Sequence, residues 1–166
     1  MYEIEQKYRI KSPQKIRSVL KKLKAKKIAS GFESNELLDR QSELRKKKSV
    51  LRLRRYQGKG ILTYKGPRLK GKFKKRIEIE TETDYDKAKK ILESLGYKTF
   101  FRYTKNREEY HYAGCSIVLD HLSSLGWFLE IEGTVKSIGM VSKKLGLRKT
   151  DEEPLSYPQL LHLNIQ

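Results

Sequence analysis

Cysteine is almost absent from this sequence, and Cys115 has no second cysteine with which to form a disulfide within the chain. The three histidines, His111, His121 and His162, are not spaced with it as zinc ligands are. A lack of disulfides is typical of a reducing compartment. We therefore expect a cytoplasmic protein without a zinc site.

Long hydrophobic runs are absent too. No stretch approaches the ~18 apolar residues of a membrane-spanning helix, and charged residues begin at Glu3, where a signal peptide would need an apolar segment. We expect a soluble protein with no membrane partner. Its 166 residues suit one domain, which we predict to span 1–166.

Acidic residues are the minority charge, because 20 Asp and Glu stand against 38 Lys and Arg and leave a formal net charge of +18. Such an excess attracts nucleotides, polyphosphates, nucleic acids or acidic membranes. The sequence contains no P-loop or other glycine-rich phosphate-binding fingerprint, and no serine or cysteine nucleophile motif. Any phosphate-binding groups are therefore sought among the charged side chains.

The tripeptide Glu-Ile-Glu occurs three times, at positions 3–5, 78–80 and 130–132. In a β-strand, residues i and i+2 share a face, so each copy presents two carboxylates on one side. If these faces look at one another, six carboxylates converge. Oxygen ligands in that number favour Mg²⁺ or Mn²⁺ over zinc.

Alternation of polar and apolar residues predicts seven or eight mostly antiparallel strands. They are Tyr2–Ile10, Phe32–Asp39, Val50–Tyr56, Ile61–Lys65, Arg76–Glu82, Phe101–His111, Ser116–Asp120 and 127–134, with a turn at 58–60. Apolar stripes predict helices. The first begins after Ser12 and is stopped by Gly31, the second lies between Asp84 and Gly96, and the others span 138–145 and a short stretch from Ser156.

The helices must bury their apolar stripes, and the only apolar surfaces on offer are the Ile, Leu and Tyr faces of the strands. For any single strand, the charged face would simply be the solvent face of an open sheet. Taken together, the strands predict an α+β protein in which a closed antiparallel barrel has a charged lumen and the helices pack outside.

Basic side chains share the predicted lumen with the acids. They are Lys7, Arg52, Arg54, Lys65, Arg76, Lys105 and Arg107. Guanidinium groups bind phosphate oxygens in a bidentate manner, and lysine binds them as a point charge. Enzymes that catalyse phosphoryl transfer usually hold a metal ion beside the phosphates.

These residues carry a resemblance to a known family. Glu3-x-Glu5-x-Lys7 resembles the ExExK signature of the CYTH superfamily, the triphosphate tunnel metalloenzymes, which include class IV adenylyl cyclases and thiamine triphosphatases. Further motifs follow in that family's order across nearly the whole chain: 37–39, 51–54, 63–67, Arg76-x-Glu78-x-Glu80, Lys105-x-Arg107, 119–120, 125–132 and Ser156-Tyr157.

The resemblance implies an eight-stranded antiparallel tunnel. It also implies roles for residues of this sequence. The implied metal ligands, for Mg²⁺ or Mn²⁺, are Glu3, Glu5, Glu130 and Glu132, with Glu78 and Glu80 as additional lumen acids. The implied phosphate-binding residues are the seven basic residues above, and Asp120 and Lys7 are the catalytic candidates.

The implied activity is closest to the adenylyl cyclase branch, which converts ATP to cyclic AMP and pyrophosphate. Hydrolysis of thiamine triphosphate or tripolyphosphate would use the same tunnel and stays an alternative. Two departures, Leu37-Leu38 in place of aromatics and Asn35 where an acid is common, bear on substrate choice.

A basic nucleic-acid-binding module is the alternative from another class. The net charge, the lysines at 46–48 and several tyrosines motivate it. Three Glu-Ile-Glu pairs argue against it, because carboxylates repel phosphate unless a metal intervenes. We therefore expect a triphosphate partner and no nucleic acid.

Overall fold

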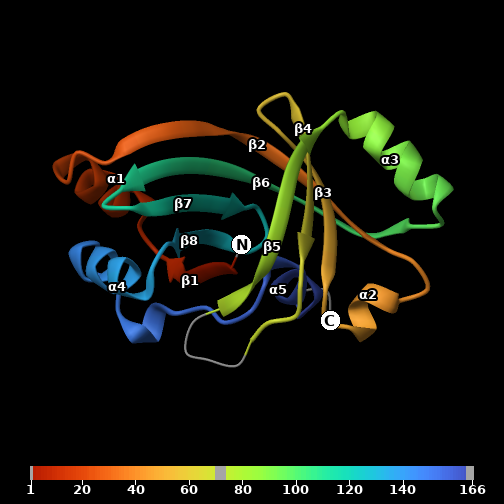
Figure 1. Cartoon of the computed structure of the whole chain (residues 1–166). Coiled ribbons are helices and arrows are strands. Elements are labelled where there is room, and N and C mark those ends of the chain that lie inside the picture. Colours follow the sequence, from red (N-terminus) through yellow and green to blue (C-terminus); the bar gives the residue numbers. More distant parts are fainter. Residues whose placement is uncertain (1, 70–73, 164–166) are drawn as a thin grey trace. The chain divides into compact units, whose positions relative to one another are not determined.

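Eight strands form a closed barrel in a computed structural model that describes residues 2–69 and 74–163 (Figure 1). Their order around the barrel is β1-β5-β4-β3-β2-β6-β7-β8, and the pairs whose register is resolved are antiparallel. The strands are β1 (Tyr2–Ile10), β2 (Lys26–Asp39), β3 (Val50–Tyr56), β4 (Lys59–Lys65), β5 (Lys74–Thr83), β6 (Lys98–Tyr112), β7 (Cys115–Leu122) and β8 (Gly126–Glu132). The predicted fold class is confirmed.

Within the described residues, five helices and one 3₁₀ turn accompany the strands. They are α1 (Pro13–Lys22), α2 (Glu43–Lys46), α3 (Tyr85–Ser94), α4 (Val135–Lys144), α5 (Tyr157–Leu163) and the 3₁₀ turn Lys149–Asp151. Of these, α2 and the 3₁₀ turn were not predicted from the sequence. No helix in the described part of the chain is long and apolar enough to span a membrane.

The chain divides into two compact units, which we describe separately. Unit 1 contains residues 1–3, 31–70 and 75–104, and unit 2 contains residues 4–30, 71–74 and 105–166. Strands β1, β2, β5 and β6 contribute residues to both. One domain over the full length stays a prediction.

In unit 1, α3 packs against β3 and β4 (Figure 1). Leu92 and Ala88 of the helix bury their side chains against Leu38 and Leu53 of the strands. Asp84 caps the helix as predicted, because its side chain accepts a hydrogen bond from the backbone nitrogen of Lys87. Helix α3 therefore packs on the apolar faces of these strands.

The hairpin between β3 and β4 turns one residue earlier than predicted. Tyr56 pairs with Lys59, so the loop is Gln57-Gly58 and not 58–60. Both loop residues have positive φ, 53° and 73°. A two-residue turn with positive φ at both positions matches the right-handed twist of the flanking strands. This match favours it over the longer loop around Gly60.

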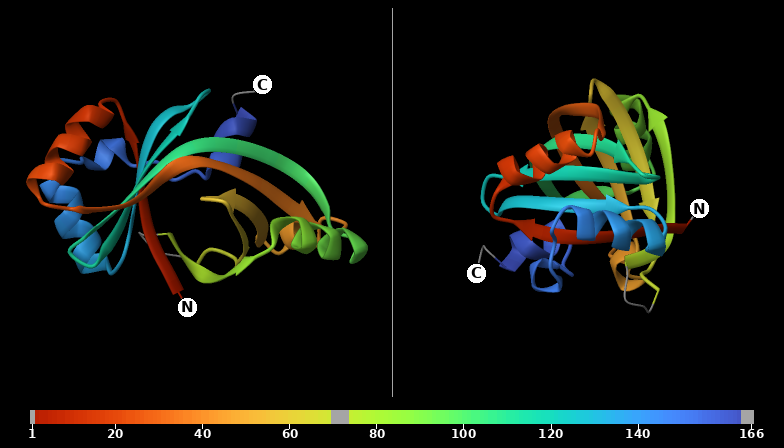
Figure 2. Two further views of the ribbon diagram at one scale, coloured as in Figure 1. Left: turned by 90° about the horizontal axis from the view of Figure 1, so that it is seen from above. Right: turned by 90° about the vertical axis from the view of Figure 1, so that its left-hand side faces the viewer.

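In unit 2, α1 and α4 cover the apolar face of the sheet that contains β1, β7 and β8 (Figure 2). Ile16 and Leu20 of α1, and Ile138 and Val141 of α4, lie in one buried cluster with strand residues such as Ile131. Helices outside the strands were predicted, and the packing confirms it. The opposite faces of these strands carry the charged residues.

The prediction that Gly31 stops the first helix is wrong. Helix α1 ends at Lys22, and Lys24 adopts the left-handed conformation, with φ of 54°, that leads into β2. Gly31 lies within β2. A lysine occupies the position where glycine usually signals a helix end, so no glycine marks the end of α1.

Candidate functional site

The charged faces of β1, β6, β7 and β8 bring five residues of unit 2 together, and α5 adds Tyr157. This Asp120 cluster consists of Lys7, Lys105, Arg107, Asp120, Glu130 and Tyr157. The strand register creates it, because Lys7 lies opposite Glu130 and Arg107 lies opposite Asp120. Five of the predicted site residues are therefore neighbours.

Asp120 is the buried centre of the cluster, with no solvent-exposed surface. Lys105 Nζ lies 2.9 Å from its Oδ2, and Arg107 donates from Nε and Nη2 at 2.8 Å each. The Tyr157 hydroxyl donates a fourth hydrogen bond at 2.9 Å. A buried carboxylate is stable only when paired in this way.

Glu130 lies between two cations of the same cluster. Its Oε1 is 3.2 Å from Lys7 Nζ, and its Oε2 is 3.4 Å from Arg107 Nη2. Among the six residues that define the cluster, three cations thus face two carboxylates, Asp120 and Glu130, a formal net charge of about +1 for this set. A largely buried net positive charge attracts anions more strongly than an exposed one does.

Burial raises the pKa of the Tyr157 phenol well above its ordinary value of 10.0, and the negative charge of Asp120 raises it further. The hydroxyl therefore stays protonated near neutral pH and donates to the carboxylate.

Glu5 and Glu132 lie directly opposite each other on β1 and β8. Like charges in a cross-strand pair destabilise a sheet unless a counter-ion lies between them. Mg²⁺ is usually bound by one or two carboxylates together with waters and substrate phosphates, and not by a cage of protein ligands. The Glu5 and Glu132 pair fits that requirement.

No group of three or more His, Cys, Asp and Glu side chains that could hold a metal ion occurs among residues 2–69 and 74–163. The four-ligand set of Glu3, Glu5, Glu130 and Glu132 stays a prediction. A magnesium ion that also binds a substrate phosphate needs fewer protein ligands. The two carboxylates of Glu5 and Glu132 match that number.

A second set of charged residues lies in unit 1, on β2, β3, β4 and β5. This Arg54 cluster consists of Glu33, Asn35, Arg52, Arg54, Thr63 and Glu80. Arg54 Nη2 lies 3.1 and 3.2 Å from the two Glu80 oxygens, and its Nη1 lies 3.3 Å from Glu33. Two arginines face two carboxylates, so this cluster is electrically balanced.

A third set, also in unit 1, is centred on Lys65. This Lys65 cluster consists of Glu3, Lys65, Arg76 and Glu78. Burial raises the pKa of Glu3, and a hydrogen bond with Glu78 raises it further. Burial opposes ionisation of Glu78 as well, yet the hydrogen bond with Glu3 and the charge of Lys65 lower its pKa. A proton shared by this pair therefore sits preferentially on Glu3.

The structure thus places every predicted site residue in one of these clusters or in the Glu5 and Glu132 pair. Their convergence on one lumen stays a prediction. Four buried residues of these clusters had not been assigned a binding or catalytic role from the sequence: Glu33, Asn35, Thr63 and Tyr157. Glu33 and Asn35 belong to a weakly alternating strand. Thr63 and Tyr157 lie in motifs of the family resemblance, which gave them no role of their own.

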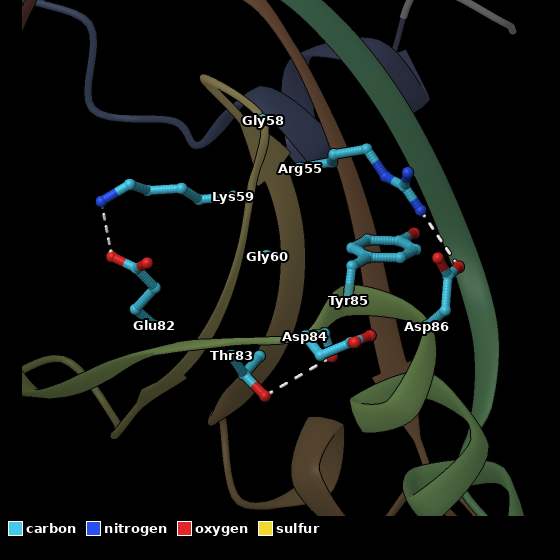
Figure 3. Close-up of a pocket in the computed structure, with 9 residues that line it drawn as sticks. All are labelled: Arg55, Gly58, Lys59, Gly60, Glu82, Thr83, Asp84, Tyr85 and Asp86. Carbon is cyan, nitrogen blue, oxygen red and sulfur yellow. Dashed lines mark hydrogen bonds and ion pairs between the residues drawn. The ribbon is translucent and has the colours of Figure 1, made fainter.

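A surface cavity of about 570 Å³ in unit 1 contains none of the predicted site residues (Figure 3). Arg55 and Asp86 form an ion pair of 3.0 Å at one side, and Lys59 and Glu82 form one of 2.8 Å at the other. These four side chains are more than half exposed, and exposed ion pairs contribute little to stability or binding. The candidate site is therefore the set of clusters and not this cavity.

Comparison with known proteins adds a family match. Residues 1–147 match the family model described as "CYTH domain". A protein of Methanocaldococcus jannaschii named "Putative adenylate cyclase" is 34% identical over 149 residues, which are 87% of this chain and 84% of that protein.

Solved structures have the same fold. An X-ray structure of a protein from Vibrio parahaemolyticus, described as a putative adenylate cyclase, matches with a TM-score of 0.87 at 23% identity and covers 98% of both chains. A protein from Hippeastrum, described as a putative adenylyl cyclase with a dominant triphosphatase activity, matches with a TM-score of 0.74 at 17% identity, over 97% of this chain and 95% of that one. At these identities, the likeness shows the fold alone.

Proposed function

Because this chain belongs to the CYTH family, whose enzymes are metal-dependent, we propose that it cleaves a phosphoanhydride bond of a triphosphate with the help of Mg²⁺ or Mn²⁺. The favoured reaction is the conversion of ATP to cyclic AMP and pyrophosphate. The relative from Methanocaldococcus jannaschii, with its name and its 34% identity, supports that choice.

The observation that carries the proposal is the net positive charge of the Asp120 cluster, in contrast to the balanced Arg54 cluster. Lys7, Lys105 and Arg107 would bind phosphate oxygens, and Arg107 would add the directional donors of a guanidinium group. Asp120 would keep Lys105 and Arg107 in place through its hydrogen bonds. In the Lys65 cluster, Lys65 and Arg76 would bind phosphate as well.

The Glu5 and Glu132 pair would hold the divalent cation. When bound, this cation supplies charge neutralisation for the phosphate oxygens. The two carboxylates would otherwise repel a triphosphate, which carries roughly four negative charges. The side chains of this protein would therefore bind and orient the triphosphate and balance its charge, as phosphoryl transfer requires.

Hydrolysis of thiamine triphosphate or tripolyphosphate is the second candidate. In cyclisation, the ribose 3′-hydroxyl attacks the α-phosphorus and pyrophosphate leaves. In hydrolysis, water attacks the terminal phosphorus, the diphosphate leaves and the attacked phosphoryl group becomes orthophosphate. Apart from Asp120, which would hold Lys105 and Arg107 in place, every residue assigned above would bind phosphate or metal. None would select the attacking oxygen, so hydrolysis stays a candidate. The activity named for the Hippeastrum protein belongs to the same fold.

Product identification tests the proposal. The protein is incubated with ATP, thiamine triphosphate or tripolyphosphate, each with Mg²⁺ or Mn²⁺. Cyclic AMP with pyrophosphate would support cyclisation, and orthophosphate would support hydrolysis. Glu132→Gln should abolish either reaction, whereas Glu93→Gln, at an exposed position on α3, should not. Intact substrates in every incubation would contradict the proposal.

A further inference from the structure

The chain beyond residue 147 lies outside the family match, yet it reaches the Asp120 cluster. Glu152 bridges to Tyr8 in antiparallel fashion, and the Glu153 nitrogen donates to the Lys7 carbonyl at 2.8 Å. The Lys7 ammonium in turn donates to the Leu155 carbonyl at 3.2 Å. This segment therefore lies along β1 at Lys7 and leads directly into α5.

Tyr157, the first residue of α5, inserts its ring into the cluster and is 4% exposed. Lys7 Nζ lies 3.7 Å from the centre of the ring, and Lys105 Nζ lies 4.9 Å from it. Phe128 packs edge-on against the same ring, with centroids 5.3 Å apart and an interplanar angle of 76°. One aromatic ring therefore contacts two of the three cations, and its hydroxyl contacts Asp120.

We infer that Tyr157 is a positioning residue that holds Lys7 and Lys105 ready for a triphosphate without cancelling their charge. This inference rests on the proposed function, because it assigns these lysines to phosphate. It gives the C-terminal segment a part in substrate binding.

The physical reason is the difference between a ring and a carboxylate. Lys7 and Lys105 are already paired with Glu130 and Asp120, respectively. A third carboxylate in place of the ring would fix the lysines further but would remove the net charge of about +1 that draws the anion. The ring attracts an ammonium group through its quadrupole and is neutral. It therefore limits the movement of the two lysines without adding another negative charge.

The hydroxyl has a separate effect. By donating to Asp120 Oδ2, it fixes the carboxylate that Lys105 and Arg107 also contact. Because the phenol stays protonated, it adds no negative charge to the cluster. Ring and hydroxyl can be separated by substitution, since Tyr157→Phe removes only the hydroxyl and Tyr157→Leu removes both.

Steady-state kinetics with tripolyphosphate and Mg²⁺ test the inference on the full chain. We expect Tyr157→Leu to raise KM about tenfold, because two cation–π contacts are lost. Tyr157→Phe should leave KM within about twofold of wild type, because the ring remains.

Tyr110 provides a matched control. It is also buried in unit 2, its hydroxyl donates to Glu108, and Lys27 lies near its ring, but it is not part of the Asp120 cluster. Tyr110→Leu should therefore leave KM within about twofold of wild type. An increase in KM as large as that of Tyr157→Leu would show a general loss of packing and would overturn the inference. So would an unchanged KM for Tyr157→Leu in an active protein.

A spectroscopic measurement keeps the inference testable if Tyr157→Leu does not fold. In the wild-type protein and in Tyr157→Phe, the ring current should shift the NMR signals of the Lys7 side-chain end upfield. Ordinary shifts for these signals would overturn the inference without any assay. A wild-type protein that shows the upfield shift but turns over no triphosphate would instead contradict the proposed function.

Discussion

At the scale of single residues, buried carboxylates of this protein are each held by several specific partners. Asp120 accepts hydrogen bonds from three side chains, and Glu36 in unit 1 accepts them from four: Tyr85, Lys89, Thr99 and Arg102. Buried polar groups of this kind rigidify a structure when every partner is present. Removing one charge from such a set should therefore be costly.

Asp120→Asn tests this directly. The substitution leaves Lys105 and Arg107 buried without the carboxylate that compensates them, and we expect a loss of about 3–5 kcal/mol in the free energy of unfolding. Chemical denaturation measures it. Asp86→Asn breaks an exposed ion pair with Arg55 and serves as the control, with stability close to wild type. Equal effects of the two substitutions would contradict the role given to burial.

Glu36 should govern part of the pH dependence of stability. Burial alone would raise its pKa, but the hydrogen bonds from Thr99, Lys89, Tyr85 and Arg102 lower it from 4.5 to about 2. Because the folded-state pKa is depressed, its contribution is present above pH 4.5 and is lost as the pH falls toward 2.

Glu36→Gln should therefore be less stable than wild type by about 2–3 kcal/mol at neutral pH, from the size of that pKa shift. The difference should shrink as the pH is lowered from 5 toward 2, a range set by the shift. Denaturation at a series of pH values measures it. A constant difference across the series would show that the charge of Glu36 is not what stabilises unit 1.

At the scale of elements, strict alternation predicted the strands well. The limits of β1 and β3 agree with the prediction to the residue, because period-two patterns mark both the face and the ends of a strand. The end of α1 and the whole of α2 were not predictable in this way. Lys24 and Ser42 adopt positive φ there, and neither residue type announces it.

The capping hydrogen bonds of the helices were also only partly predictable from the sequence, and they provide a test. Thr134 caps α4, and its Oγ1 accepts a hydrogen bond from the Ser137 nitrogen at 3.1 Å. Ser12 occupies the cap position of α1 as predicted, but its side chain makes no capping hydrogen bond.

We therefore expect Thr134→Ala to lower the free energy of unfolding by about 1 kcal/mol and Ser12→Ala to leave it nearly unchanged. Thermal or chemical unfolding of both variants measures the difference. A larger loss for Ser12→Ala would contradict this assignment of the caps.

At the scale of the whole molecule, the sequence predicted the fold class and the residue types of the site, but not the pairs. Alternation shows that Arg107 and Asp120 point to the polar side of their strands. It does not show the offset between neighbouring strands, which places one opposite the other. Nor does it show that Tyr157, from a helix outside the barrel, would contact both Lys7 and Asp120.

The net charge of +18 does not itself describe the site. The Arg54 cluster is balanced, and the Asp120 cluster has an excess of only about one positive charge. Under the proposed function, specific recognition of a triphosphate would depend on a few placed groups and a metal ion, whereas the remaining surface charge would attract any polyanion.

The most direct test is a calorimetric titration of the protein with tripolyphosphate, first in Mg²⁺ and then in EDTA. We predict saturable binding in Mg²⁺ that is lost in EDTA, and lost in Mg²⁺ when Glu132 is replaced by Gln. Binding that is unchanged by EDTA and by Glu132→Gln, and that only weakens steeply with added salt, would contradict a metal-dependent triphosphate site.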